Sequence, residues 1–298
     1  MGIRHAQFDG SALPRAIPFL ERELRVLTDE HLNEDAPIFL LSAGWRSGST
    51  LVQRLINSDS SALLWGEPFE DLAIVHRLAR TVELFWPDGG HLKHAIDHFE
   101  GSLSNEWVAN LNPGLLPLWR AHREFFAQLF AAPARERARP RWGCKWVRLT
   151  AGHAYYLRWL YPSAKFVFLV RHPLHSLSSY QGRRWFYVRP DMRVNYRWQF
   201  LHHWKRIAGS FLDEYRNLGA MLVRYEDVVS SDETVQALSE HLDIRIDRGV
   251  LRDRIGTSGS KKQRIGPLTR LLLAHQAGHL CERFGYELSG GVRPRPTL

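Results

Sequence analysis

The sequence predicts an α/β fold in which helices flank a doubly wound parallel sheet. Residues 37–41 form a short apolar run that leads into a loop rich in Gly and Ser, and apolar residues then recur at helical spacing over residues 51–56. Residues 165–170 form a continuous β-branched and aromatic run, which is typical of a strand buried on both faces of a parallel sheet. Further strands alternate with helices along the chain, and this alternation indicates a doubly wound sheet.

The other predicted elements surround these two strands. Helical patterns cover residues 15–32, 195–218 and 268–284, and short strands are expected at residues 61–66, 142–147 and 220–224. We expect residues 73–130 to form a mostly helical insertion that covers a pocket. Its many Trp and Phe residues are more typical of a core than of a binding surface, so a role as a lid is less favoured. A tail rich in Gly, Pro and Arg, at about residues 289–298, is expected to be disordered. The sequence therefore predicts one domain over residues 1–298.

Composition limits the class of protein. With 44% hydrophobic and 12% aromatic residues, the 298-residue chain has the composition of a soluble globular protein. No apolar run approaches the roughly 18 residues of a membrane span, and the N-terminus lacks the apolar core of a signal peptide. Cys144 and Cys281 are too few for a disulfide framework or a zinc site, so free thiols are expected. We therefore expect a cytoplasmic protein.

The net charge of +9 is compatible with a nucleic acid, an acidic polymer or an anionic cofactor as the partner. Basic residues cluster at 135–141, at 183–184 and at 261–264. We interpret the first cluster, which follows Ala131, Ala132 and Pro133, as a solvated connection between elements.

The loop after the first strand has the composition of an anion-binding site. Its glycines let the backbone approach an anion closely, and its hydroxyls lie beside the unpaired N–H groups of a helix start. These residues are Gly44, Ser47, Gly48, Ser49 and Thr50. Compared with the triphosphate loop G-x-x-x-x-G-K-[ST], Ala43 replaces the first glycine and Ser49 replaces the lysine. The sequence thus predicts a P-loop-like fold whose cation, Arg46, lies within the loop.

Charged side chains follow or interrupt the neighbouring strands. Ligands of a parallel sheet bind beyond the carboxyl ends of its strands, where Glu67 and Arg171 are expected to meet the loop. A nucleotide kinase would end a second buried strand in Asp to hold magnesium, and this chain has Arg171 there. We therefore expect arginine to neutralise phosphate and expect no metal. Lys145, within a predicted strand, either extends along the sheet edge to water or points into the site.

A second phosphate contact is predicted after Arg171. If a helix begins near Leu174, Ser179 lies about one and a half turns into it, so that Arg171 and Ser179 converge on one phosphate. We expect Arg183 to lie one turn further along the same face of that helix.

These segments resemble the sulfotransferases that use 3′-phosphoadenosine 5′-phosphosulfate (PAPS). Residues 45–51 (W-R-S-G-S-T-L) resemble the 5′-phosphosulfate loop of that family, and Arg171-His172-Pro173 through Ser179 resemble its 3′-phosphate motif. Residues 224–228 (R-Y-E-D-V) are similar to the R-Y-E-D-L segment, and residues 258–264 lie where the family closes a basic loop over the nucleotide. The resemblance extends over about residues 36–265, and the two phosphate motifs occur in the family's order.

The resemblance implies roles for these residues. Arg46, together with Gly66-Glu67, is more similar to tyrosylprotein and bacterial carbohydrate sulfotransferases, whose glutamate is the catalytic base. It implies that Glu67 is the base and that Arg46 and Lys145 are the cations at the transferring group. The implied nucleotide contacts are the loop residues Arg46 to Thr50, then Arg171, Ser179, Arg183, Tyr225, Lys261 and Lys262. PAPS would be the cosubstrate, PAP the product, and the hydroxyl of a sugar, a phenol or tyrosine, or another small molecule the acceptor.

Two other functions remain as alternatives. A P-loop nucleotide kinase is disfavoured by the missing loop lysine and strand-end Asp. A polyanion- or nucleic-acid-binding protein would use the positive charge, but the chain lacks a basic helix with base-reading side chains, so we expect no nucleic-acid partner. The aromatic segments suit a phenol, a sugar face or a lipid equally well.

Overall fold

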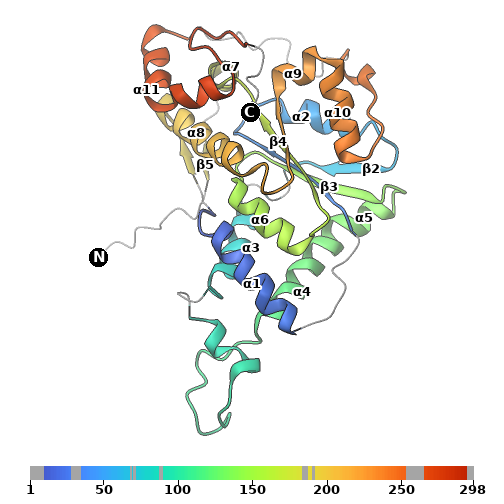
Figure 1. The fold of residues 1–298 in the computed structure, drawn as a ribbon, viewed down its shortest axis with the longest axis vertical. Helices are drawn as coiled ribbons and strands as arrows, with labels where there is room; N and C mark the ends of the chain where they lie inside the picture. The colour runs from blue at the N-terminus through green and yellow to red at the C-terminus, as the bar shows by residue number, and fades with distance from the viewer. Residues whose placement is uncertain are drawn as a thin grey trace.

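The computed structural model describes residues 10–27, 35–67, 69, 72–86, 90–182, 187–189, 192–252 and 265–293 (Figure 1). Its centre is a five-stranded parallel sheet in the order β2-β3-β1-β4-β7. The strands are β1 (Ile38–Ser42), β2 (Ala62–Trp65), β3 (Arg141–Trp146), β4 (Lys165–Val170) and β7 (Met221–Arg224). This sheet confirms the predicted α/β fold with a doubly wound parallel sheet.

One face of the sheet has an aliphatic core. Along β1, alternate residues such as Ile38 and Leu40 point to this face. It is covered by α2 (Ser49–Ile56), α9 (Tyr225–Ser230) and α10 (Asp232–Leu242) (Figure 1). Val52, Val228 and Leu238 of these helices are buried against the strands. The loop after β1 therefore leads into a helix packed on this smaller face.

The other face has a larger, aromatic core. Phe39 of β1 packs against Trp142, Phe166 and Tyr161 with ring centroids 5.5 to 6.3 Å apart. The helices that bury side chains here are α1 (Leu13–Leu27), α3 (Ile74–Glu83), α4 (Leu115–Phe126), α6 (Ala151–Leu160), α7 (Pro173–Gly182), α8 (Arg197–Glu214) and α11 (Pro267–Arg283). Within the described residues, the buried Phe, Tyr and Trp side chains belong to the core on this face.

The predicted insertion is helical mainly at its two ends. Between α3 and α4 the described residues form the short 3₁₀ turns η3 (Leu92–His94) and η4 (Ile96–His98) and a β-bridge between Ala95 and Asn112, and this stretch extends away from the sheet (Figure 1). After α4 come a π-helical turn, η5 (Ala127–Ala131), and α5 (Ala132–Arg135). Trp119 and Phe126 are buried in the aromatic core, whereas Trp107 is 77% exposed. The aromatic residues of the insertion thus divide between core and surface.

The chain after α7 completes the fold. A two-stranded antiparallel ribbon, β5 (Tyr187–Arg189) and β6 (Met192–Val194), precedes α8, and a 3₁₀ turn, η6 (Arg248–Leu251), follows α10. After α11, residues 284–293 fold back as a turn closed by an antiparallel bridge between Tyr286 and Val292, which we call the C-terminal hairpin. Residues 289–293, at the start of the tail for which we expected disorder, are therefore hydrogen-bonded, and residues 294–298 lie outside the described residues. None of the described helices is long and apolar enough to cross a membrane.

Candidate active site

The loop between β1 and α2 has the backbone of an anion cradle. Gly44, Arg46 and Gly48 all have positive φ, at 86°, 63° and 88°. A Cβ on Gly48 would lie 2.1 Å from the ring of Tyr225, so only glycine fits there. A left-handed conformation is uncommon for a residue other than glycine, and such strain clusters at ligand-binding sites. The loop therefore has a tight backbone path of the kind that anion-binding loops use.

The start of the loop is fixed to the adjoining strand end. The N–H of Gly44 donates to the carbonyl of Val147, just beyond β3, at 3.0 Å, and the hydroxyls of Ser42 and Ser47 are hydrogen-bonded to each other. Ser49 and Thr50 then form the first turn of α2, with Gly48 as the N-cap. The first N–H groups of a helix have no intrahelical acceptor and carry partial positive charge. Phosphate or sulfate oxygens are the natural partners of such a helix start.

The structure brings the two predicted phosphate motifs together. The Nε of Arg46 donates to the hydroxyl of Ser179 on α7 at 2.9 Å. One terminal guanidinium nitrogen of Arg171, which follows β4, donates to the carbonyl of Arg46 at 2.9 Å. Segments more than 120 residues apart in the sequence thus meet at the carboxyl edge of the sheet, because β1 and β4 are neighbouring parallel strands.

The Tyr225 ring packs against both Arg171 and the loop after β1. The guanidinium of Arg171 lies over the Tyr225 ring, 4.4 Å from its centroid, in a cation–π contact. The same ring packs against the loop at Gly48. On the other side, the indole N–H of Trp204 in α8 donates to the Arg171 carbonyl at 3.0 Å. Arg171 is therefore held through both its side chain and its main chain.

Glu67 and Lys145 form an ion pair at the ends of the next two strands. The Lys145 ammonium donates to the Glu67 carboxylate, and the Lys145 N–H donates to the carbonyl of Gly66 at 3.3 Å. The Lys145 side chain is only 4% exposed, whereas that of Glu67 is 29% exposed. Lys145 lies opposite Leu40 in the register of β1 and β3, so its side chain is on the face that α2 covers. Lys145 therefore points towards Glu67 on the face that α2 covers, and Glu67 remains accessible from solvent.

Three predicted nucleotide contacts cannot be located. Arg183, Lys261 and Lys262 lie outside the described residues, as does the basic loop at 258–264. Their assignment stays a prediction.

Sequence reasoning missed the residues behind the loop. The Trp45 ring stacks on Tyr180 with centroids 6.1 Å apart and lies 5.6 Å from the ring of His203. Burial, together with Arg206 and Arg148, holds the pKa of His203 well below its usual value, so this imidazole is neutral. The signal in the sequence was the position of His203 on the apolar stripe of the helix over residues 195–218, next to Trp204.

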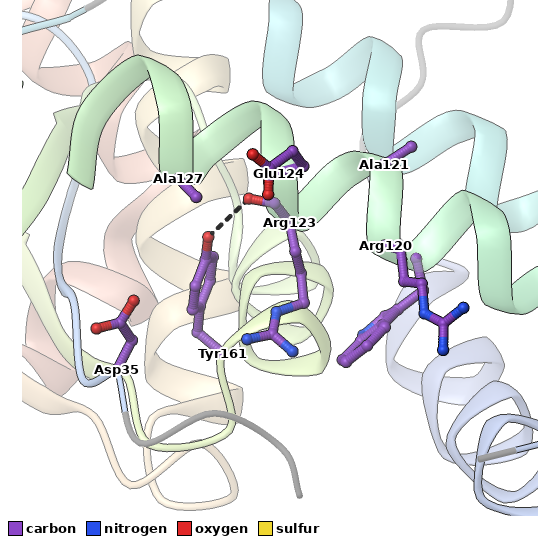
Figure 2. A pocket seen from close by; sticks show the side chains of 8 residues that line it. Asp35, Arg120, Ala121, Arg123, Glu124, Ala127 and Tyr161 are labelled. Atoms are coloured by element: carbon purple, nitrogen blue, oxygen red, sulfur yellow. Dashed lines mark hydrogen bonds between the residues drawn. The ribbon is translucent and has the colours of Figure 1, made fainter. Parts of the chain in front are cut away.

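Figure 2 shows the side chains that line a cavity of about 530 Å³. The cavity lies where β1 and β4 begin, at the opposite edge of the sheet from the loop. It is bordered by Asp35, which precedes β1, by Tyr161, which precedes β4, and by α4. The guanidinium of Arg123 lies over the rings of Trp119 and Tyr161, and the Tyr161 hydroxyl donates to the Arg123 carbonyl at 3.1 Å. Since ligands of parallel sheets bind at the carboxyl ends of the strands, we place the active site at the loop.

Comparison with known proteins agrees with the motifs at that edge. Residues 37–248, well over half of the chain, match the model of a family described as the sulfotransferase family. The chain belongs to this family. Its membership confirms the family predicted from the motifs and makes the protein a transferase enzyme, in a family that uses PAPS. No curated protein sequence matches this sulfotransferase.

Several solved structures are similar to this sulfotransferase. The sulfotransferase domain of the olefin synthase from Synechococcus PCC 7002 is 20% identical, with a TM-score of 0.49, and the match covers 87% of this chain and 97% of that one. The sulfotransferase domain from the curacin biosynthetic pathway is 15% identical, with a TM-score of 0.45 and coverage of 85% and 98%. Sulfotransferase STF9 from Mycobacterium avium is 16% identical, with a TM-score of 0.42 and coverage of 94% and 84%.

Among the described residues of this sulfotransferase, no group of three or more His, Cys, Asp or Glu side chains is placed to hold a metal ion.

Proposed function

We propose that this protein transfers a sulfuryl group from PAPS to an acceptor hydroxyl by in-line displacement, with Glu67 as the base. One observation carries the proposal: the hydrogen bond from Arg46 to Ser179 joins the loop to the second phosphate motif. A nucleotide with phosphates on both its 5′ and 3′ positions needs two anion sites of this kind side by side.

The nucleotide fits the residues at this edge. The loop glycines, Ser49 and Thr50 offer backbone and hydroxyl donors at a helix start, which suits the 5′ phosphosulfate. Arg171 and Ser179 offer a guanidinium and a hydroxyl for the 3′ phosphate, and arginine binds phosphate through paired N–H donors. Arg46 lies between the two sites, with its carbonyl bonded to Arg171 and its side chain to Ser179.

The transfer step requires a proton acceptor and a cation at the reacting group. The acceptor oxygen forms a bond to sulfur, the bond from sulfur to the bridging oxygen breaks, and PAP leaves with the electron pair. The acceptor proton passes to Glu67, a step that contributes roughly 10²–10⁴-fold in comparable cases. Negative charge develops on the bridging oxygen, where the ammonium of Lys145 and the guanidinium of Arg46 would stabilise it. The ion pair of Lys145 with Glu67 supports this arrangement because it holds base and cation together.

A ligand-binding experiment tests the nucleotide. Thermal unfolding is followed with PAP in the absence of magnesium and with ATP plus magnesium. We expect PAP at one hundred times its dissociation constant to stabilise the protein by about 2.7 kcal/mol. Stabilisation by ATP with magnesium, and none by PAP, would overturn the proposal in favour of a kinase.

An activity screen tests the transfer. Labelled PAPS is offered with tyrosine peptides, sugars and phenols, and we expect label on the hydroxyl of at least one class. The similarity of Arg46 and Gly66-Glu67 to the tyrosylprotein and bacterial carbohydrate enzymes makes peptides and sugars the first acceptors to try.

A further inference from the structure

The segment Arg224-Tyr225-Glu226-Asp227 faces two parts of the molecule. Tyr225 packs on the loop and beneath Arg171. The other three side chains bind one another, the C-terminal hairpin, or the turn that follows Arg171. One short segment therefore connects the nucleotide site to the end of the described chain.

Arg224 fastens both ends of the C-terminal hairpin. Its guanidinium is 4% exposed and makes two hydrogen bonds to the Asp227 carboxylate, at 2.7 and 2.6 Å. The same side chain donates to the carbonyls of Phe284 and Arg293, at 2.9 and 2.8 Å. These four bonds use four of the five N–H donors of the guanidinium, and they fix where the hairpin lies.

Glu226 connects the hairpin to Arg171. One carboxylate oxygen accepts the N–H of His172, the residue after Arg171, at 3.0 Å. The other accepts the hydroxyl of Tyr286 in the hairpin at 3.1 Å. His172 also bonds to the hairpin directly, through its Nε2 and the Glu287 carbonyl at 2.8 Å, and its ring lies 4.9 Å from that of Tyr286.

The main chain of Arg171 is consequently held on both sides. Trp204 donates to the Arg171 carbonyl, and Glu226 accepts the next N–H, each at 3.0 Å. The peptide between Arg171 and His172 therefore cannot rotate without breaking one of these bonds. A fixed backbone orients the guanidinium before the ligand arrives, which reduces the entropy lost on binding.

We propose that Glu226 and Tyr286 are positioning residues for Arg171. Through them, the C-terminal hairpin holds Arg171 in place for the 3′ phosphate. This inference rests on the proposed function, because it takes Arg171 to bind the 3′ phosphate. It assigns a role in nucleotide recognition to residues that do not touch the nucleotide.

The test compares two nucleotides that differ in the 3′ phosphate alone. Dissociation constants of PAP and of adenosine 5′-phosphate are measured for the full chain and for Tyr286→Phe and Glu226→Gln, at a temperature well below unfolding. We expect PAP to bind each variant roughly fivefold to tenfold more weakly, about the value of one net hydrogen bond. Adenosine 5′-phosphate should bind within about twofold of the parent value, because it makes no use of Arg171.

A surface variant provides the control. Asp213 on α8 lies 3.9 Å from Arg283 at the end of α11, and both side chains are largely exposed. Asp213→Asn thus alters a contact beside the same C-terminal region without reaching Glu226. We expect the affinity ratio of the two nucleotides to be unchanged in this variant.

Three outcomes decide the inference. If both nucleotides weaken equally, or if the melting temperature falls with the ratio unchanged, Glu226 and Tyr286 act only in stability and the inference is wrong. If Arg171→Ala lowers the ratio while Tyr286→Phe and Glu226→Gln do not, the inference alone fails. If Arg171→Ala itself leaves the ratio unchanged, the assignment of the 3′ phosphate under the proposed function fails instead. Tyr286→Phe keeps the ring in the core, so it serves if Glu226→Gln does not fold.

Discussion

The two halves of the candidate site are built differently. In the nucleotide half, Arg171 contacts the Arg46 carbonyl, the Tyr225 ring and Trp204, which come from three separate elements. In the transfer half, the central contact is the single ion pair of Glu67 with Lys145. The Lys145 end of that pair is buried and the Glu67 end is partly exposed.

Under the proposed function, this difference corresponds to what each half would have to do. The nucleotide is the same in every turnover, so rigid and prearranged contacts increase its affinity without loss of function. The proposed base would have to meet an acceptor that arrives from solvent, and the partly exposed Glu67 carboxylate is accessible to such an acceptor. Substitutions in the two halves should therefore affect different kinetic constants.

The largest effect is expected in the transfer half. Glu67→Gln removes the proton acceptor but keeps an oxygen that can bond to Lys145, so the fold and the nucleotide site should be retained. We expect kcat to fall by roughly 10²–10⁴-fold, with PAP affinity changed less than about twofold. Steady-state kinetics with labelled PAPS and titration calorimetry measure the two quantities.

Glu240→Gln, an exposed carboxylate on α10, is the control and should change neither quantity. Turnover at the parent rate by Glu67→Gln would show that Glu67 is not the base, and the two halves would then no longer differ in the way we propose.

A smaller effect, on binding, is expected in the nucleotide half. Arg171→Ala removes a charge-assisted contact to phosphate, which is worth about 1.5–3 kcal/mol, so PAP should bind roughly 10- to 100-fold more weakly. At saturating PAPS, kcat should fall much less than in Glu67→Gln. Arg158→Ala is a matched control, because Arg158 also lies over a tyrosine ring, 4.9 Å from the centroid of Tyr155, and also donates to a carbonyl, that of Asn217. An unchanged PAP affinity in Arg171→Ala would remove Arg171 from the nucleotide site.

The sequence predicts those features that depend on local pattern. The run at residues 165–170 is apolar throughout because both faces of β4 are buried, and the structure has a strand over those residues. The strand, glycine loop and helix around Arg46 can likewise be predicted from the local sequence, because glycine readily adopts the positive φ found at Gly44 and Gly48. Because β2, β3 and β4 run parallel, Glu67, Lys145 and Arg171 lie at the carboxyl edge of the sheet, at or near the ends of their strands.

Contacts between distant segments could not be predicted. The bond from Arg46 to Ser179 and those from Arg224 to Phe284 and Arg293 depend on how helices pack after folding. Our interpretation of the arginine cluster at 135–141 as a solvated connection is wrong for Arg139 and for Arg141, which begins β3 and donates to the Leu242 carbonyl at 2.6 Å. One nitrogen of Arg139 donates to the carbonyls of Asn57 and Asp59, in the turn before β2, and of Ala62, the first residue of β2. A charge pattern alone does not reveal such acceptors, because they are backbone atoms.

The smallest effect, counted per pH unit, is the change of the unfolding free energy with pH, and it compares the nucleotide half with the aromatic core. Burial lowers the pKa of His172, beside Arg171, and of His122, on α4, to about 4. Neutral His172 accepts the N–H of Leu174 on Nδ1 and donates from Nε2 to the Glu287 carbonyl, and protonation would abolish the first of these bonds.

Because the imidazole of the unfolded chain titrates near 6.5, the unfolded state binds more protons than the folded state between pH 6.5 and 4. The stabilisation is thus complete above pH 6.5 and is lost as pH falls towards 4, by roughly 1 kcal/mol per pH unit for each group.

Two histidine variants test this effect. Urea unfolding between pH 7.5 and 4.5 should show a flatter pH dependence in both His172→Gln and His122→Gln than in the parent. PAP affinity should fall only in His172→Gln, because His122 contacts Thr81 and Tyr156 in the aromatic core and not the nucleotide half. Equal pH dependence in the parent and in both variants would mean that these imidazoles are not held neutral. Equal loss of PAP affinity in both variants would mean that a change in the aromatic core reaches the nucleotide half, so that the two regions do not respond independently to substitution.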